Sequence, residues 1–280
     1  MIKAFLKHFK LLLIVFVVFS LSTFLFCLFF LSPKYQSIAV LYPPNTHSFS
    51  NLVSAGMQFG YDKEIGEHVE ILRSNPVKNV LIEKFNLGEH YEIDKHNPYF
   101  KDLLLEKYEK NISISRSINK SIQIRVLDKS PELSASIANE LIKIADKHKS
   151  EIIHSNLKQA TNSAKSSYDT KQEIVNIMSD SLTRLRNQGE AVWNLGEERK
   201  SGRYINYELQ YRKEMEQFYG FKTKYEEMAS LLNQEVPRSY VISNAVSSSK
   251  AVFPRKGISS ILMGTIASLI VFVSLQLKED

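Results

Sequence analysis

Residues 111–149 decide the fold, and their sequence is NISISRSINKSIQIRVLDKSPELSASIANELIKIADKHK. In the first half, apolar side chains alternate with polar ones, which is the period of a half-buried β-strand. A short polar segment separates the two alternating runs, so we expect two strands joined by a loop. Their apolar positions are Ile112, Ile114, Ile122, Ile124 and Val126.

The second half of this stretch predicts a helix that packs on the strands. Ser130 is a favoured N-cap residue, Pro131 suits the first helical position, and Glu132 lies near the positive end of the helix dipole. The apolar stripe of the helix contains many small side chains, which favours close packing on a sheet. It consists of Ala135, Ala138, Leu141, Ile142 and Ala145.

The helical pattern continues beyond residue 149 without a stop signal. Apolar residues recur at spacings of three and four, interrupted only at Lys171 or Gln172, as in the seam of a long or coiled helix. A helix from Pro131 to Arg186 would be about 80 Å long. The seam consists of Ile153, Leu157, Ala160, Ala164, Tyr168, Val175, Met178, Leu182 and Leu185.

Gly189, Gly196 and Gly202 then break the pattern and predict a tip near residues 187–203. An aromatic seam follows the tip, and its side chains are bulky where the first seam offers alanines. The helices before and after the tip form the two legs of an extension over residues 131–236, and large side chains of one leg can pack against small ones of the other. An aromatic stripe can also stack on sugars, but at helical spacing it is more typical of a core. The second seam consists of Tyr204, Tyr207, Tyr211, Met215, Phe218, Tyr225, Met228 and Leu232.

The remaining segments complete an α/β base over residues 33–130. The alternation in YQSIAVLYPP, residues 35–44, predicts a strand, and residues 52–72 show a mixed helical pattern. A short strand over residues 240–245 would return the chain to the sheet near the first strand. It belongs to a connection, residues 237–256, in which SSSK is a linker.

The base also contains a helix with clear start and stop signals. It begins at Ser74 or Asn75, has Pro76 in its first turn, and is expected to end at Gly88. Its apolar face consists of Val77, Val80, Leu81 and Phe85.

Both ends of the sequence carry an uncharged apolar segment of membrane length. We expect transmembrane helices at residues 11–31 and 257–277, which place both termini on one side of the membrane and the bulk of the chain on the other. Three lysines in residues 1–10 assign that segment and residues 278–280 to the cytoplasm by the positive-inside rule.

Two observations offer alternatives to this topology. A cleaved signal peptide would explain the first segment, but the apolar run is too long and no small-x-small cleavage site follows. Arg255 and Lys256 flank the second span on its outer side and favour the opposite orientation, but the first span usually dominates insertion. Cys27 is the single cysteine, so a disulfide within the chain is excluded, and we expect its side chain to face lipid.

In the second span, Ser260, Gly264 and Ser268 repeat at four-residue spacing, and Pro254 marks the entry into the membrane. Such a small-xxx-small face permits close approach of another helix in lipid. We expect it to pack against the first span or against a partner protein. The alternative is that glycine and serine are simply common in spans.

The composition argues against nucleic-acid binding and against catalysis. The net charge is +6, but lysines are interleaved with glutamates, which indicates a mixed, solvated surface. The seven histidines have no metal-ligand spacing, and the sequence has no phosphate-loop or nucleophile-elbow motif. We therefore expect no catalytic residues, no cofactor and no metal site.

Several segments, in this order, resemble the Wzz-type polysaccharide co-polymerases, the chain-length determinants of O-antigen, capsule and exopolysaccharide. They are PKYQSIAVLYP (33–43), VEILRSNPVKNVLIEKFNL (69–87), the strands and helix of residues 112–149, and the entry at Pro254 into a span rich in small residues. The resemblance covers nearly the whole chain. This chain differs from the family pattern in being short and in keeping only Pro254 of the usual proline cluster.

The resemblance implies a bacterial inner-membrane protein with an α+β base near the bilayer and a long helical extension into the periplasm. Such proteins form homo-oligomeric rings and set the length of a polymer made by a separate Wzy-type polymerase, without catalysing glycosyl transfer. The implied partners are further copies of the chain, the polymerase, membrane lipid and the growing polysaccharide. Some relatives continue into a tyrosine kinase domain, and because this sequence ends at Asp280 we expect a member without one.

Two other classes of function share some of these features. An inner-membrane component of capsule or exopolysaccharide export would have the same plan of two spans and long helices. A sensory receptor would need a cytoplasmic signalling module, whereas only QLKED follows the apolar part of the second span.

Overall fold

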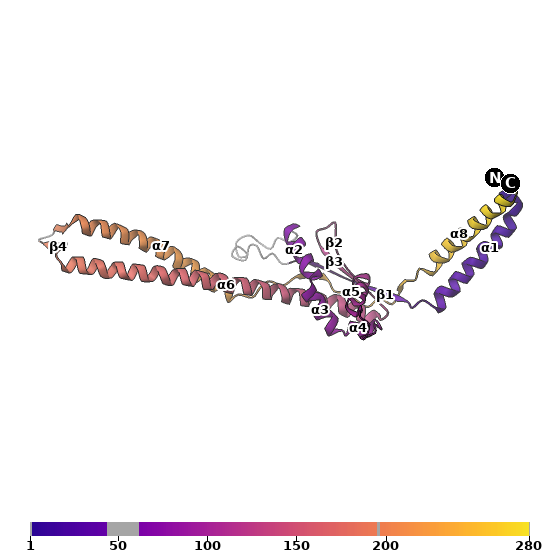
Figure 1. The fold of residues 1–280 in the computed structure, drawn as a ribbon, viewed down its shortest axis with the longest axis horizontal. Coiled ribbons are helices and arrows are strands. Elements are labelled where there is room, and N and C mark those ends of the chain that lie inside the picture. Colours follow the sequence, from indigo (N-terminus) through magenta and orange to yellow (C-terminus); the bar gives the residue numbers. More distant parts are fainter. Residues whose placement is uncertain (1, 44–61, 195–196, 280) are drawn as a thin grey trace. The chain divides into compact units, whose positions relative to one another are not determined.

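A computed structural model describes residues 2–43, 62–194 and 197–279, which form two compact units (Figure 1). The boundary between the units lies inside one continuous helix, α6 (Pro131–Asn187), between Ala145 and Asp146. The base-containing unit therefore includes the first turns of this helix, which the sequence assigns to the extension. The first unit comprises residues 2–43, 62–145 and 239–279, and the second comprises residues 146–194 and 197–238.

An antiparallel sheet of five strands forms the centre of the first unit. Its order is β2-β3-β1-β6, and β7 pairs with β1 on the edge that β6 also uses. The strands predicted from alternation are confirmed, including the return strand beside the first strand, whereas β7 was not anticipated. The bounds are β1 (Lys34–Tyr42), β2 (Ile112–Arg116), β3 (Ile122–Asp128), β6 (Tyr240–Ser243) and β7 (Ala251–Phe253).

The alternating side chains fix the register of these strands. Ile114 lies opposite Ile124, and Ile124 lies opposite Ala39 on the other side. All three side chains are buried. A slip of one residue would turn these side chains to the other face of the sheet, so the pattern specifies the pairing.

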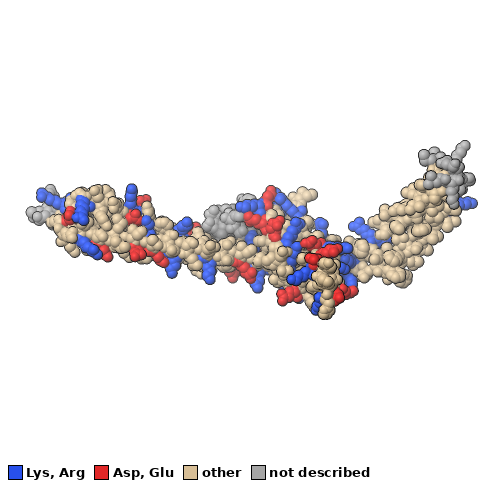
Figure 2. Space-filling view, in the orientation of Figure 1, with Lys and Arg blue, Asp and Glu red and all other residues tan. Residues whose placement is uncertain are grey.

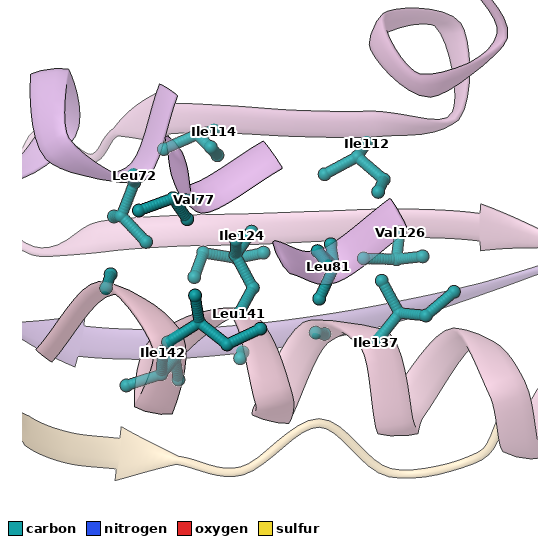
Figure 3. Packing of buried hydrophobic residues seen from close by; sticks show 14 of the residues in the cluster. Leu72, Val77, Leu81, Ile112, Ile114, Ile124, Val126, Ile137, Leu141 and Ile142 are labelled. Carbon is teal, nitrogen blue, oxygen red and sulfur yellow. The ribbon is translucent and has the colours of Figure 1, made fainter. Parts of the chain in front are cut away.

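Helices cover the sheet and share one hydrophobic core with it (Figure 3). Leu72, Val77 and Leu81 meet the strand residues, and the predicted small-residue stripe of α6 is confirmed as buried. Ser134 of α6 lies 2.7 Å from Ser37 of β1, oxygen to oxygen, which shows how closely this helix approaches the sheet. The other helices are α2 (Asp62–Arg73), α3 (Asn75–Lys84), α4 (Leu87–His90) and α5 (Phe100–Asn111).

The predicted helix end at Gly88 is wrong, because α3 ends at Lys84. Asn86 adopts a left-handed backbone conformation (φ 45°) and separates α3 from α4. Gly88 lies inside α4, where an added Cβ would approach Phe100 Cζ at 2.9 Å, so this glycine permits close packing instead of stopping the helix. Val80, predicted on the apolar face of α3, is 48% exposed.

Helix α5 was not predicted, and the mixed helical pattern of residues 52–72 is only partly described. Its later part is α2, which begins at Asp62, while residues 52–61 lie outside the described residues.

The second unit is a helical hairpin with antiparallel legs, α6 and α7 (Gly202–Leu232) (Figure 1). A two-stranded hairpin, β4 (Ala191–Asn194) and β5 (Glu197–Lys200), joins the legs where the glycines interrupt the helical pattern. Gly189 has a positive φ of 82°, which favours glycine at the end of α6. The break was predicted from sequence, but the small sheet was not.

Helices α1 (Ile2–Phe29) and α8 (Lys256–Glu279) pack along one another. Each is long and apolar enough to cross a membrane, judged by length and composition, over residues 9–29 and 256–276. The pair is almost free of charged side chains in Figure 2, whereas lysine, arginine and acidic residues are intermixed over the rest of the visible face. This intermixing agrees with the mixed surface expected from the sequence.

Candidate functional site

One face of each membrane-length helix forms the contact between α1 and α8. On α1, Leu12 and Cys27 are buried and Phe16 and Ser20 are partly buried, and the spacing places all four on one side of the helix. The Ser20 hydroxyl donates a hydrogen bond to the Ser260 carbonyl oxygen at 2.8 Å. The helices therefore approach closely enough for a side chain of one to reach the backbone of the other.

Gly264 lies where the two helices approach each other closely. A Cβ added at this position would lie 2.8 Å from Ser20 Oγ and 2.9 Å from the Phe16 carbonyl oxygen. Both distances are shorter than a Cβ atom tolerates, so the neighbouring atoms would have to move. Ser260 is 6% exposed, and Ser268 is partly buried and donates a hydrogen bond to the Gly264 carbonyl oxygen at 2.6 Å. All three residues of the predicted small-xxx-small face thus lie on the buried side of α8.

The position of Cys27 differs from the one predicted from the sequence. Its side chain, expected to face lipid, is buried with 4% exposure. The reason is its position seven residues after Ser20, which places it on the same face of α1. Pro254 lies between β7 and α8, after a cis peptide bond from Phe253.

The seams of the helical hairpin pack against each other through aromatic side chains. Tyr168 of α6 stacks on Tyr225 of α7 with ring centroids 5.7 Å apart, and it also contacts Phe218 at 5.4 Å. Both α7 residues belong to the predicted aromatic seam and are partly buried. Their packing favours the core interpretation of that seam over a sugar-stacking surface.

Lys171, the residue that interrupts the α6 seam, has partners on α7. Its ammonium group lies 2.5 Å from Glu214 Oε2 and donates a hydrogen bond to Gln217 Oε1 at 2.7 Å. The two ionic side chains are only 15% and 28% exposed. A polar contact between the legs therefore replaces apolar packing at this level of the seam.

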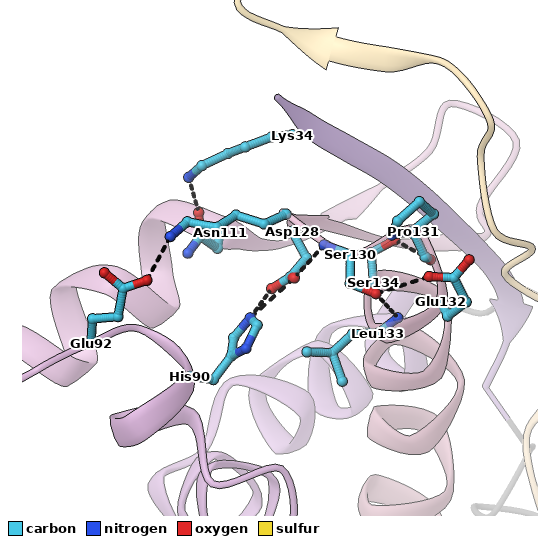
Figure 4. A network of polar contacts seen from close by, with 11 residues as sticks. Lys34, His90, Glu92, Asn111, Asp128, Ser130, Pro131, Glu132, Leu133 and Ser134 are labelled. Atoms are coloured by element: carbon cyan, nitrogen blue, oxygen red, sulfur yellow. Dashed lines mark hydrogen bonds and ion pairs between the residues drawn. The ribbon is translucent and has the colours of Figure 1, made fainter. Parts of the chain in front are cut away.

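The start of α6 is fixed by a polar network in the base (Figure 4). Ser130 Oγ accepts a hydrogen bond from the Leu133 N–H at 3.2 Å, which confirms the predicted N-cap. Asp128, buried at the end of β3, accepts from the Ser130 N–H at 2.9 Å and lies 2.8 Å from His90 Nε2. The sequence does not predict the His90–Asp128 pair, because residues this far apart in the chain follow no local pattern.

Within residues 2–43, 62–194 and 197–279, His, Cys, Asp and Glu side chains form no group of three that could hold a metal ion.

The fold and the helix contact define a class of protein with two membrane-length terminal helices, a small α+β base and a long helical hairpin. Residues 1–85 match the model of the family described as Wzz, chain length determinant protein. The match confirms the predicted family resemblance over this N-terminal segment, which contains the first membrane-length helix and strand β1. No curated protein sequence matches this chain.

Solved structures of polysaccharide co-polymerases are similar to this chain at low identity. A full-length bacterial polysaccharide co-polymerase is 11% identical, with 100% of this chain and 97% of that chain covered and a TM-score of 0.41. A fragment of WzzB, the polysaccharide co-polymerase from Salmonella Typhimurium, is 10% identical, with coverages of 79% and 100% and a TM-score of 0.42. The Shigella flexneri lipopolysaccharide O-antigen chain-length regulator WzzB is 9% identical, with coverages of 78% and 99% and a TM-score of 0.37.

Proposed function

We propose that this protein is a non-catalytic regulator of polysaccharide chain length in the bacterial inner membrane. The observation that carries the proposal is the match of residues 1–85 to the chain length determinant family. The polymer is an O-antigen, a capsule or an exopolysaccharide, and a separate Wzy-type polymerase makes it. The regulator acts by assembly and contact, without a cofactor and without glycosyl transfer of its own.

The proposed topology follows from the two membrane-length helices and the lysines of residues 1–10. The positive-inside rule places both termini in the cytoplasm. Residues 33–130, with the connection at residues 237–256, then form a base beside the outer surface of the membrane, and residues 131–236 extend into the periplasm.

Self-assembly into a ring is part of the same proposal. Helices α6 and α7 keep large apolar side chains exposed although their seams are already packed together. A stripe outside the seam can contact a neighbouring copy, which suits a closed homo-oligomer. The exposed residues include Ile152, Ile174, Ile177, Ile205, Leu209 and Tyr219.

The face formed by Ser260, Gly264 and Ser268 has a role in this scheme. We propose that it packs the two spans of one protomer together, since the Ser260 carbonyl oxygen accepts a hydrogen bond from Ser20, and a side chain at Gly264 would clash with Phe16 and Ser20. Pro254 then marks the point at which the chain re-enters the membrane. Anchoring the base at both ends holds it next to the polymerase.

A deletion with complementation tests the function. Surface polysaccharide from the deletion strain and from the complemented strain would be compared by gel electrophoresis, and intracellular polymer would be measured in parallel. Loss of a chain-length regulator is expected to leave polymer at the surface with an altered length distribution. Polymer trapped inside the cell would instead identify an export component, and an unchanged ladder would contradict both functions.

A further inference from the structure

A cavity of about 130 Å³ opens on the base beside the first residue of β1. Its lining combines cationic and hydrogen-bonding side chains from four elements or their flanking loops. Lys34, Lys107, Lys129, His90, Tyr91 and Asp128 are among the lining residues. The helix-pair contact and the helical hairpin described above use none of these residues.

The cavity lies close to the point where both membrane-length helices join the sheet. Lys34 follows the end of α1 at Phe29 by five residues, and it pairs with Phe253 of β7. Phe253 precedes the start of α8 at Lys256 by three residues. A fully extended chain of three residues spans at most about 11 Å, which limits the distance from Phe253 to α8. The headgroup layer of a bilayer is about 5–8 Å thick on each side, so Lys34 is held at or near that layer.

Positive charge gathers at this cavity without complete neutralisation. The Lys34 ammonium group donates a hydrogen bond to Asn111 Oδ1 at 2.8 Å, and that partner is uncharged (Figure 4). Burial lowers the pKa of Lys34, the nearby ammonium groups of Lys110 and Lys107 lower it further, and the opposing effect of the Asp128 carboxylate is smaller. An anion in the cavity would offset this repulsion between lysines.

The acidic groups at the cavity are already engaged. The carboxylate of Asp128 contacts His90 and the Ser130 N–H, and Glu92 pairs with Lys129 at 2.9 Å. Burial raises the pKa of Tyr91 to about 12, so its hydroxyl stays protonated and can donate a hydrogen bond.

We propose that this cavity binds the phosphate of an anionic membrane lipid, with Lys34 and Lys107 as its cationic ligands. Lysine binds phosphate as a point charge, and basic side chains next to a bilayer are attracted to anionic headgroups. The chemistry recognised is the phosphate group. The position beside Lys34, close in the chain to both membrane-length helices, favours a lipid headgroup over phosphate from solution.

Native mass spectrometry of the full-length protein tests this site. The protein would be extracted from nanodiscs containing phosphatidylglycerol or only phosphatidylcholine, and the lipid molecules retained per protomer would be counted. We expect retention of phosphatidylglycerol over phosphatidylcholine, and a loss of about tenfold in the double variant K34Q/K107Q. The variant K34R/K107R keeps both charges and should retain the lipid.

Two controls separate the outcomes. K63Q/K143Q removes two lysines that are each 74% exposed in the same unit and should not change retention. K107Q alone changes an exposed side chain, so it reports on the site even if the Lys34 variants fold poorly. Equal retention by the wild type, K107Q and K34Q/K107Q would overturn the site. Displacement of the lipid by millimolar inorganic phosphate, with no preference for phosphatidylglycerol, would overturn the lipid assignment.

Discussion

The Ser20 hydroxyl of α1 donates a hydrogen bond to the Ser260 carbonyl oxygen of α8 at 2.8 Å, across 240 residues of sequence. The bond lies beside Gly264, whose missing side chain leaves room for Ser20 and Phe16. Close backbone approach and an interhelical hydrogen bond thus occur at the same level of the helix pair. Small residues and such bonds are the two main sources of helix association in lipid.

Replacing Gly264 with alanine should separate α1 from α8. The added Cβ would meet the Phe16 carbonyl oxygen, a backbone atom that moves only if the helices move. We expect a loss of about 1–3 kcal/mol in the free energy of unfolding, measured by titrating the full-length protein in micelles with sodium dodecyl sulfate. If the helix pair anchors the base beside the polymerase, the polysaccharide length distribution should shift as well, and more strongly with leucine at this position.

The matched control for this experiment is Gly257→Ala in the same helix. A Cβ at Gly257 would meet nothing within 4 Å, so both readouts should stay at their wild-type values. Equal losses for the two substitutions would contradict packing against Phe16 as the cause, and helix propensity alone would stabilise both variants because alanine is a better helix former than glycine.

The contribution of the interhelical hydrogen bond is tested by Ser20→Ala. Because the side chain becomes smaller, the substitution removes the bond without adding a clash. We expect a loss of about 0.6 kcal/mol in the same unfolding titration, the average for hydrogen bonds between membrane helices. Ser274→Ala is the control, since the exposed Ser274 hydroxyl bonds only within its own helix, to Val271. A larger loss for Ser274→Ala would contradict the assignment.

The sequence predicts the elements of this protein where a local pattern specifies them. The period of two in residues 112–126 identified both strands, and the Ser130–Pro131 signal located the start of α6. Ser260, Gly264 and Ser268, which repeat at four-residue spacing, lie on the buried side of α8, and their role in packing the spans stays a prediction.

The errors occur where a residue type has two uses that sequence alone does not separate. The sequence predicts a helix stop at Gly88, but this glycine makes room for Phe100, which comes from a helix that the sequence does not predict. The sequence predicts a lipid-facing Cys27, because Leu25 and Phe26 before it are bulky and the apolar run continues past it, whereas the structure buries its side chain. The cavity beside Lys34 depends on residues from distant segments, and no period in the chain brings Lys34, His90 and Lys107 together.

The contact between Lys171 and Glu214 should stabilise the helical hairpin only while both partners are present. Lys171→Met leaves the partly buried Glu214 carboxylate without its cation, and we expect a loss of about 1–3 kcal/mol in the free energy of unfolding. The double variant K171M/E214L should recover most of this loss, because apolar pairs often replace such ion pairs without cost. Circular dichroism, recorded during thermal unfolding of the full-length protein, measures the stability of the single and the double variant. Additive losses in the double variant would contradict a direct interaction.

Acid should weaken the end of the hairpin near β5 through Glu208. Lys200 and Arg212 each donate a hydrogen bond to this carboxylate at 2.9 Å and lower its pKa from the usual 4.5. Because the folded pKa is the lower one, the unfolded state binds more protons between the two values. The stabilisation is therefore complete above about pH 4.5 and is lost as the pH falls through the folded pKa.

The variant Glu208→Gln isolates this effect from the titration of other carboxylates. It should be less stable than the wild type at neutral pH, by at most about 1 kcal/mol for such partly exposed pairs, and the difference should be smaller at an acidic pH below the folded pKa. Thermal unfolding at both pH values measures it, with Glu216→Gln, exposed on the same helix, as the control. A difference that persists undiminished below the folded pKa would mean that Glu208 stabilises α7 through packing or helix propensity, because a protonated carboxyl group has lost its ionic partners.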